Sequence, residues 1–295
     1  GPAEDRLRSM FPGATASREA AAYVVAGAPL DVSTSFQPGT RFGPERIRRF
    51  ARPFDDYDRR TDQRFSDLAV HDHGEVRAWD DAPAYLAWLA GQLRDVVADG
   101  AVPLVLGGEH TVSAAGVGAV DPDVFVCLDA HLDLREAYDG NEHSHATVTR
   151  RILDSAGVDV ERDGDGGEPA GQGVEEAVLL GARTGSPAEW DRAQEPDVTV
   201  VAPEDVADFD ADAHLNGRRA YLSVDIDAAD PGFAPGTGTP EPFGLAPREL
   251  RDVVRAVAPS AAGFDVVEVN DRDDGQAASL AAKLCREFVY AHADG

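Results

Sequence analysis

An apolar run that stops at a cluster of charged residues constrains the fold of this chain more than any other feature. Residues 124–128 read Val-Phe-Val-Cys-Leu and are followed by Asp129-Ala130-His131-Leu132-Asp133. A short apolar run that ends at its first charge is typical of a buried strand in a parallel sheet. Where extended backbone continues, a spacing of two residues puts both carboxylates and the imidazole on one side. Such a cluster is costly unless a cation lies between the carboxylates.

Three further strand-like runs end in the same way. Residues 102–106 lead into Gly107-Gly108-Glu109-His110, residues 219–224 lead into Asp225-Ile226-Asp227, and residues 263–267 lead into Glu268. Ligand sites of open α/β sheets lie outside the carboxyl ends of the strands. A single aspartate at a strand end is better explained as a cap of the next helix, but six metal-type side chains are hard to explain that way. The predicted metal ligands are His110, Asp129, His131, Asp133, Asp225 and Asp227.

The charge of this set predicts two metal ions. Four carboxylates cannot be buried together in ionised form without a counter-charge, because their repulsion would raise their pKa values strongly. Two divalent ions match the four negative charges. Mixed carboxylate and imidazole ligation favours Mn²⁺, Fe²⁺ or Co²⁺, with zinc compatible and calcium less so. Two such ions can share a bridging water and lower its pKa, which predicts a hydrolysis.

Strand-like and helix-like segments alternate along the whole chain without a linker, which favours one α/β domain over residues 10–295. Residues 1–9 are expected to be a disordered terminus, and Gly1-Pro2 resembles a tag-cleavage scar. The expected strands are 20–27, 102–106, 124–128, 177–181, 198–201, 219–227 and 263–268, and the expected helices are one from Gly43-Pro44, one from Asp81 to Gly100, 187–193, 247–257 and 276–291. Residues 54–81 are expected to be a charged connection in which His71-Asp72-His73 is solvated, and 159–175 a solvated loop.

The charge of the chain limits its partners. The 27 basic and 54 acidic residues give a formal net charge of −27, and no basic patch for nucleic acid is visible. Acidic residues spread over the whole length predict a salt-adapted protein, because molar salt screens their repulsion. Cys127 and Cys285 do not form a disulfide framework, and no run approaches the roughly 18 apolar residues of a membrane span. A cytoplasmic protein without a membrane partner is therefore predicted.

The strand-end motifs resemble those of the ureohydrolases, the arginase and agmatinase family. The resemblance runs from about Tyr23 to the final helix. It is carried by Gly107-Gly108-Glu109-His110, Asp129-Ala130-His131-Leu132-Asp133, Ser223-Val224-Asp225-Ile226-Asp227 and Asp230-Pro231 with Pro235-Gly236-Thr237-Gly238-Thr239-Pro240. It implies a three-layer α/β/α domain around a mainly parallel eight-stranded sheet, a site with two Mn²⁺ per subunit, and a homo-oligomer, commonly a trimer or hexamer.

The resemblance also implies a role for each site residue. His110 and Asp133 would hold one manganese, His131 and Asp227 the other, and Asp129 and Asp225 would bridge them. Of the pair His143 and His145, we favour His145 as the histidine that binds near the leaving group or transfers protons, with Glu268 as the carboxylate that orients the guanidinium. Four residues depart from the usual pattern on the substrate side, namely Glu109, Ala146, Phe243 and Asp271.

The loops after the first metal motif are most similar to those of archaeal-type agmatinases. Asp133-Leu134-Arg135-Glu136 and Ser144-His145-Ala146-Thr147 differ from the arginase loop, which usually reads Asn-x-His-Gly. The expected reaction is agmatine plus water to putrescine plus urea, a step in polyamine biosynthesis. Arginine, guanidinobutyrate and formiminoglutamate are alternative substrates within the family. The alternative outside the enzyme class is an inactive metal-binding homologue with a regulatory role.

Overall fold

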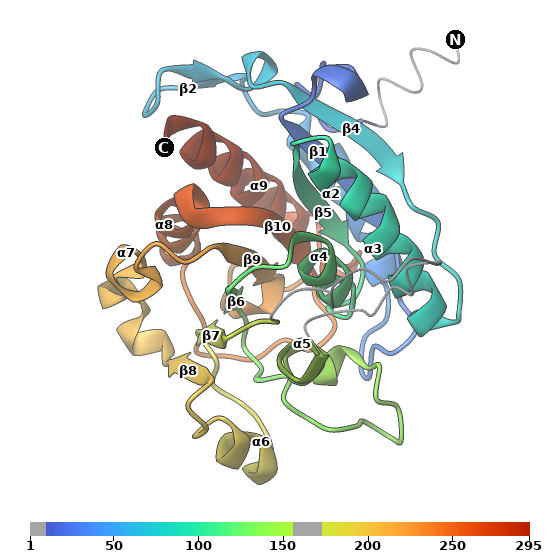
Figure 1. The fold of residues 1–295 in the computed structure, drawn as a ribbon, viewed down its shortest axis with the longest axis vertical. Helices are drawn as coiled ribbons and strands as arrows, with labels where there is room; N and C mark the ends of the chain where they lie inside the picture. Colours follow the sequence, from blue (N-terminus) through green and yellow to red (C-terminus); the bar gives the residue numbers. More distant parts are fainter. Residues whose placement is uncertain (1–9, 156–172) are drawn as a thin grey trace, which may run out of the picture.

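Eight parallel strands form one sheet through the middle of the chain, in the order β4-β1-β5-β10-β9-β6-β7-β8 (Figure 1). The structure is a computed structural model that describes residues 10–155 and 173–295. The strands are β1 (Tyr23–Ala28), β4 (Val70–Glu75), β5 (Val102–Gly107), β6 (Val124–Leu128), β7 (Glu176–Leu180), β8 (Val198–Val201), β9 (Ala220–Asp225) and β10 (Ala261–Val267). Every pairing within this sheet is parallel. Strands β2 (Tyr57–Asp58) and β3 (Gln63–Arg64) form a separate antiparallel pair.

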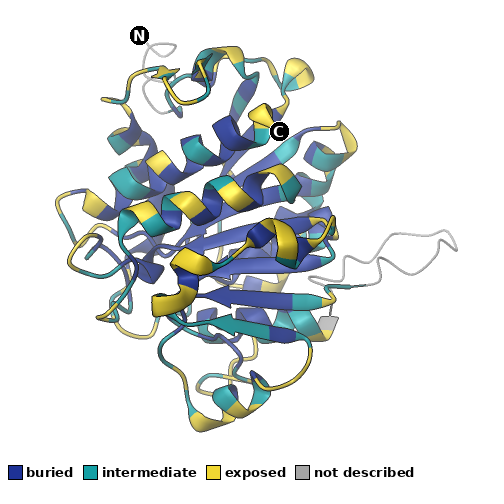
Figure 2. Cartoon of the chain, turned by 90° about the vertical axis from the view of Figure 1, so that its left-hand side faces the viewer, coloured by how far each residue is buried: buried dark blue, intermediate teal, exposed yellow. Residues whose placement is uncertain are grey.

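Helices cover both faces of the sheet and complete the predicted three-layer α/β/α arrangement. One face carries α2 (Gly43–Ala51), α8 (Pro247–Val257) and α9 (Gln276–Asp294), and the other carries α3 (Ala82–Ala98), α4 (Val112–Val120) and α5 (Val148–Ser155). The short helices α6 (Pro187–Arg192) and α7 (Ala211–Leu215) lie towards the β8 side of the molecule in Figure 1. Figure 2 shows that the strands are buried throughout most of their length, whereas the helices expose only their outer faces. Burial on both faces explains why these strands read as continuous apolar runs.

Local signals set several of the helix boundaries. The Asp81 carboxylate accepts a hydrogen bond of 3.1 Å from the Ala84 N–H and thereby caps α3. Pro44 lies in the first turn of α2, where its missing N–H has no intrahelical partner to lose. Ser186 and Glu189 form a reciprocal capping box at the start of α6. The expected helix 247–257 is confirmed as α8, and the other expected strands and helices agree with the structure within a few residues.

The prediction that residues 54–81 form a charged connection was wrong for the segment His71-Asp72-His73. Residues of the His71-Asp72-His73 segment belong to the edge strand β4, which pairs with β1. The Asp72 carboxylate is buried and accepts two hydrogen bonds of 2.8 Å from the Arg48 guanidinium and one of 2.6 Å from the Phe11 N–H. A polar strand is therefore stabilised by a bidentate ion pair whose partner lies on α2, which the local sequence pattern does not indicate.

Two expectations lie outside the described residues, namely the disordered terminus at 1–9 and almost all of the loop at 159–175. Within residues 10–155 and 173–295, no helix combines the length and apolar character needed to cross a membrane.

Candidate metal centre

Three strands, β5, β6 and β9, carry all six predicted metal ligands at or just beyond their carboxyl ends, and β10, which lies between β5 and β9, leads into Glu268. The turn after β5 requires glycine at Gly108, because its φ is +36° and a Cβ there would collide with the Ala28 carbonyl oxygen. This tight turn holds His110 against the ends of the adjacent strands. The sheet therefore brings together side chains that are far apart in the sequence.

His110 directs its Nδ1 atom at three carboxylates. The nearest carboxylate oxygens of Asp133, Asp129 and Asp225 lie 2.8, 3.1 and 3.4 Å from this atom. The His110 side chain is fully buried, and the three carboxylates are almost fully buried. One imidazole nitrogen carries at most one proton, so it cannot satisfy three carboxylates.

His131 forms the second half of the cluster. Its Nδ1 atom lies 3.1 Å from Asp227 and 3.5 Å from Asp129. The Asp129 oxygen that faces His131 is Oδ1, whereas the oxygen that faces His110 is Oδ2. Asp129 therefore lies between the two histidines. Backbone N–H groups hold the acids as well: Asp227 accepts a bond of 3.1 Å from Ala130.

The electrostatics of the cluster show a deficit of positive charge. Burial, followed by the charge of Asp129, raises the pKa of Asp133 to about 7. Burial and the other carboxylates of the cluster raise the pKa of Asp225 well above its ordinary value. For Asp129 itself, burial is opposed by hydrogen bonds from His110 and His131, which together lower its pKa. The carboxylates outnumber the two imidazoles, and bound cations would stabilise their ionised forms.

The residues present fit a pair of divalent cations. The donors are four carboxylates and two imidazoles, a set suited to manganese, iron, cobalt or zinc. Two imidazoles, even if both were protonated, would leave two negative charges unbalanced in a buried site. The structure brings together all six side chains that the sequence predicted as ligands.

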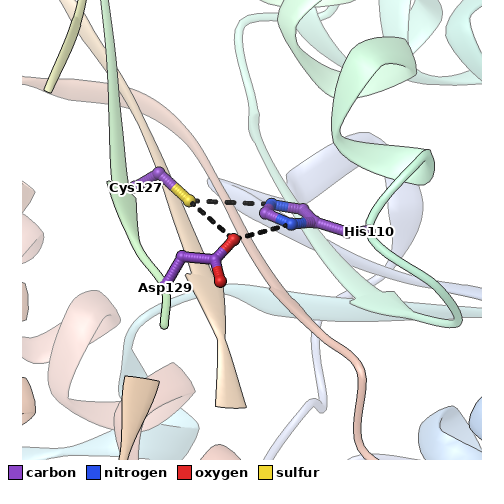
Figure 3. Close-up of side chains that lie close together, drawn as sticks. All are labelled: His110, Cys127 and Asp129. Carbon is purple, nitrogen blue, oxygen red and sulfur yellow. Dashed lines mark hydrogen bonds and ion pairs between the residues drawn. The ribbon is translucent and has the colours of Figure 1, made fainter. Parts of the chain in front are cut away.

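Cys127 lies close to His110 and Asp129, and by distance alone these three side chains could also hold an ion. Its Sγ atom is 3.6 Å from His110 Nε2 and 4.0 Å from Asp129 Oδ2 (Figure 3). His110 Nδ1, on the other side of the ring, faces the carboxylates. Burial raises the pKa of the Cys127 thiol to about 12, and a protonated thiol is a poor ligand. We therefore assign Cys127 to packing behind His110.

His145 and Glu268 adjoin the cluster from two different segments. His145 begins the short 3-10 helix η4 (His145–Thr147), and its Nδ1 atom lies 3.9 Å from Glu268 Oε1. Glu268 follows β10 and accepts a hydrogen bond of 2.7 Å from the His110 N–H. His143 is exposed, whereas His145 is buried, which agrees with our preference for His145.

Burial and nearby charges shift the pKa values of His145 and Glu268. Burial, followed by the charges of His131 and His110, lowers the pKa of His145 to about 4. Burial and the charge of Glu109 raise the pKa of Glu268 well above its ordinary value. Asp133 and Glu268 also have left-handed backbone, with φ of 52° and 65°. A buried carboxylate whose pKa is raised, as that of Glu268 is, is suited to a cationic ligand.

Sequence reasoning missed Arg183, which holds the loops around Asp227. Its guanidinium donates bonds of 2.7 Å to the carbonyl oxygens of Asp227 and Glu241 and one of 3.2 Å to that of Ala228. These acceptors belong to the segment after β9 and to the Gly/Pro-rich loop, so one side chain joins the two. No local pattern marks such a residue, because its partners are backbone atoms of distant segments.

Sequence reasoning also missed the polar groups behind His110. The Ser223 hydroxyl lies 3.2 Å from His110 Nε2 and donates a bond of 2.6 Å to the buried Asp265 carboxylate. A partner on the second nitrogen of a ligating histidine fixes the orientation of its ring. The alternation of side chains along β9 and β10 could have indicated that these residues face the same layer.

Comparisons with known proteins show which family this chain resembles as a whole. Residues 21–290 match the model of the Arginase family. The chain is 34% identical over 278 residues to an N(1)-aminopropylagmatine ureohydrolase of Thermococcus kodakarensis, with 90% of this chain and 89% of the relative covered. It is 32% identical over 285 residues to an agmatinase of Bacillus anthracis, with 92% of each covered. The solved structure of an agmatine ureohydrolase of Thermoplasma volcanium superposes with a TM-score of 0.84 at 31% identity, covering 97% of this chain and 94% of that one.

Proposed function

This chain belongs to the arginase family, a family of binuclear metal hydrolases, and we propose that it hydrolyses agmatine to putrescine and urea. The observation that carries this proposal is the cluster of six ligand-type side chains with His145 and Glu268 beside it. We place agmatine first for two reasons. The loop sequence resembles that of agmatinases, and the chain is similar to proteins named as an agmatinase and an agmatine ureohydrolase.

We assign the six ligands to two Mn²⁺ ions. His110 and Asp133 would hold one ion, His131 and Asp227 the other, and Asp129 and Asp225 would bridge. The position of Asp129 supports this assignment, since its two oxygens face different histidines. When bound, such ions supply Lewis acidity and lower the pKa of water, which is the chemistry that a hydrolysis requires.

The protein groups on the substrate side would bind the guanidinium and handle its protons. A carboxylate matches a planar guanidinium with two parallel hydrogen bonds, and Glu268, a buried acid close to His145, would make this contact. His145 lies beside Glu268 and is neutral at pH 7. It can therefore accept a proton and pass it to the departing amine nitrogen. Neutral imidazole also avoids repulsion with the cationic substrate.

A second candidate substrate is N(1)-aminopropylagmatine, which extends agmatine at its amine end. The relative from Thermococcus kodakarensis that shares 34% identity with this chain is named for it. Both compounds present the same guanidinium to Glu268 and differ only in the tail. The loops at the rim of the site, not the metal ligands, would distinguish them.

Urea release tests the proposal. The purified protein is loaded with Mn²⁺ in molar salt and given agmatine, N(1)-aminopropylagmatine, arginine, guanidinobutyrate or formiminoglutamate, with formamide measured for the last. We expect agmatine to give the highest kcat/KM. Faster hydrolysis of another compound would reassign the substrate, and no hydrolysis of any compound by a fully loaded protein would favour the inactive homologue.

A further inference from the structure

The loop between β1 and α2 contacts His145, and the Glu109 carboxylate accepts hydrogen bonds from the same loop. Glu109 is fully buried and directly precedes His110. Its carboxylate accepts bonds of 2.8 Å from the Val32 N–H, 2.7 Å from the Ser33 N–H and 2.7 Å from the Ser33 hydroxyl. A fourth bond of 2.7 Å comes from Thr111. Four donors on one buried carboxylate fix this part of the loop firmly relative to the metal cluster.

Two hydroxyl groups of this loop, those of Ser33 and Ser35, contact His145. The Ser33 hydroxyl accepts a bond of 2.9 Å from the His145 backbone N–H, while its own proton goes to Glu109. The Ser35 hydroxyl lies 3.2 Å from His145 Nε2. The backbone and the ring of His145 are thus both held by one loop. The ring of Tyr138 contacts the imidazole edge-on, with ring centroids 6.4 Å apart.

Ser35 holds one imidazole nitrogen of His145 and leaves the other for other partners. A serine hydroxyl can donate to Nε2 or accept from it, so the contact fixes the rotation of the ring in either tautomer. With Nε2 engaged, Nδ1 is the nitrogen directed toward Glu268, 3.9 Å away. The neighbouring hydroxyl of Thr34 does not take part, because it donates to Asp31 at 3.0 Å.

We propose that Ser35 is a positioning residue for His145, and that the Glu109–Ser33 contact keeps Ser35 in place. Ser35 fixes the rotation of the imidazole, and Ser33 fixes the backbone from which the imidazole extends. The kinetic part of this inference rests on the proposed function, in which His145 transfers a proton. The structural part does not depend on it.

Kinetics of Ser35→Ala, Ser35→Thr and Thr34→Val test the inference with the Mn²⁺-loaded protein and agmatine. Losing one orienting hydrogen bond of about 1 kcal/mol lowers kcat about fivefold in Ser35→Ala, with KM within about twofold. Ser35→Thr keeps a hydroxyl and restores kcat to within about twofold, and Thr34→Val is the control on the same loop. Equal losses in Ser35→Ala and Thr34→Val, or a loss of bound manganese in Ser35→Ala, would overturn the inference.

A spectroscopic readout separates this inference from the proposed function. The protein is labelled with ¹⁵N-histidine and loaded with diamagnetic Zn²⁺, and the His145 signals are assigned with His145→Gln. We expect the Nε2 ¹⁵N shift of His145 to move in Ser35→Ala, because Nε2 loses its hydrogen-bond partner, and to stay unchanged in Thr34→Val. Unchanged shifts in Ser35→Ala would refute the positioning role. If no guanidino compound is hydrolysed, the proposed function fails and the ¹⁵N shifts alone decide the role of Ser35.

Discussion

The His131 imidazole lies 3.1 Å from the Asp227 carboxylate, although the two residues follow different strands, β6 and β9. These strands are neighbours in the sheet, so their carboxyl ends deliver both side chains to one place. The contact lies within one half of the ligand cluster, and Asp129 joins that half to His110. Substitutions in this cluster should therefore change metal binding first and activity as a consequence.

Asp129→Asn should abolish manganese binding and activity together. The substitution removes a negative charge from the carboxylate that lies between His110 and His131, and an amide is a much weaker ligand. Metal content after dialysis and urea release from agmatine are the two measurements. Asp121→Asn is the matched control, since Asp121 is exposed at the end of α4. A variant Asp129→Asn that kept both properties would contradict the bridging assignment.

Glu268→Gln should keep its manganese but bind substrate poorly. The amide can still accept the bond from the His110 N–H, so the metal side is preserved, while the charge opposite the guanidinium is lost. A charged hydrogen bond of about 1.5–3 kcal/mol corresponds to a fall of roughly 10- to 100-fold in kcat/KM, chiefly through KM. The control is Glu204→Gln at an exposed position. An unchanged KM would remove Glu268 from the substrate contact.

His145 should stay neutral until the solution is far more acidic than is usual for histidine. Burial, then the charges of His131 and His110, lower its pKa from 6.5 to about 4. Between these two values the unfolded chain binds a proton at this residue and the folded chain does not. The contribution to stability is therefore present above pH 6.5 and is lost as the pH falls toward 4. An NMR titration of the ring should give a midpoint below about 5, against about 6.5 in denaturant. Equal midpoints in the two states would contradict the burial of this imidazole.

Salt should stabilise the folded chain strongly. At a net charge of −27 the folded surface repels itself, and at 1 M salt the screening length falls to about 3 Å. We expect the midpoint of thermal unfolding to rise by about 10 °C between dilute buffer and 2 M KCl, which corresponds to a few kcal/mol. A neutral osmolyte at equal osmolality serves as the control. Full stability in salt-free buffer would refute the prediction of salt adaptation.

The positions of the six ligand-type residues were predictable because their signals are local, since each ends or closely follows an apolar run. Strand alternation alone does not place Asp129, His131 and Asp133 on one side, because β6 ends at Leu128 and Asp133 has left-handed backbone. The resemblance to the ureohydrolases then supplied the sheet and its number of strands. What the spacing alone could not give is the strand order, in which β9 and β10 lie between β5 and β6.

The residues that were missed depend on partners far away in the sequence. Asp72 reads as solvated until Arg48 on α2 is placed against it. Ser35 reads as an ordinary loop serine until Glu109 has fixed the conformation of the loop. In both cases the hydrogen bond exists only after the tertiary structure has formed, so no local pattern records it.

The left-handed backbone at Asp133 and Glu268 offers a way to recognise loss of function in descendants of this chain. A side chain in this region costs about 1–2 kcal/mol, and glycine avoids the cost. Natural selection for activity opposes that change at these two positions, because each carboxylate has a place in the proposed chemistry. Once such selection ends, glycine in place of Asp133 relieves both the backbone strain and the repulsion from Asp129, whereas glycine in place of Glu268 would leave the buried His110 N–H without its acceptor. A descendant that has glycine only in place of Asp133 is therefore expected to be more stable and inactive.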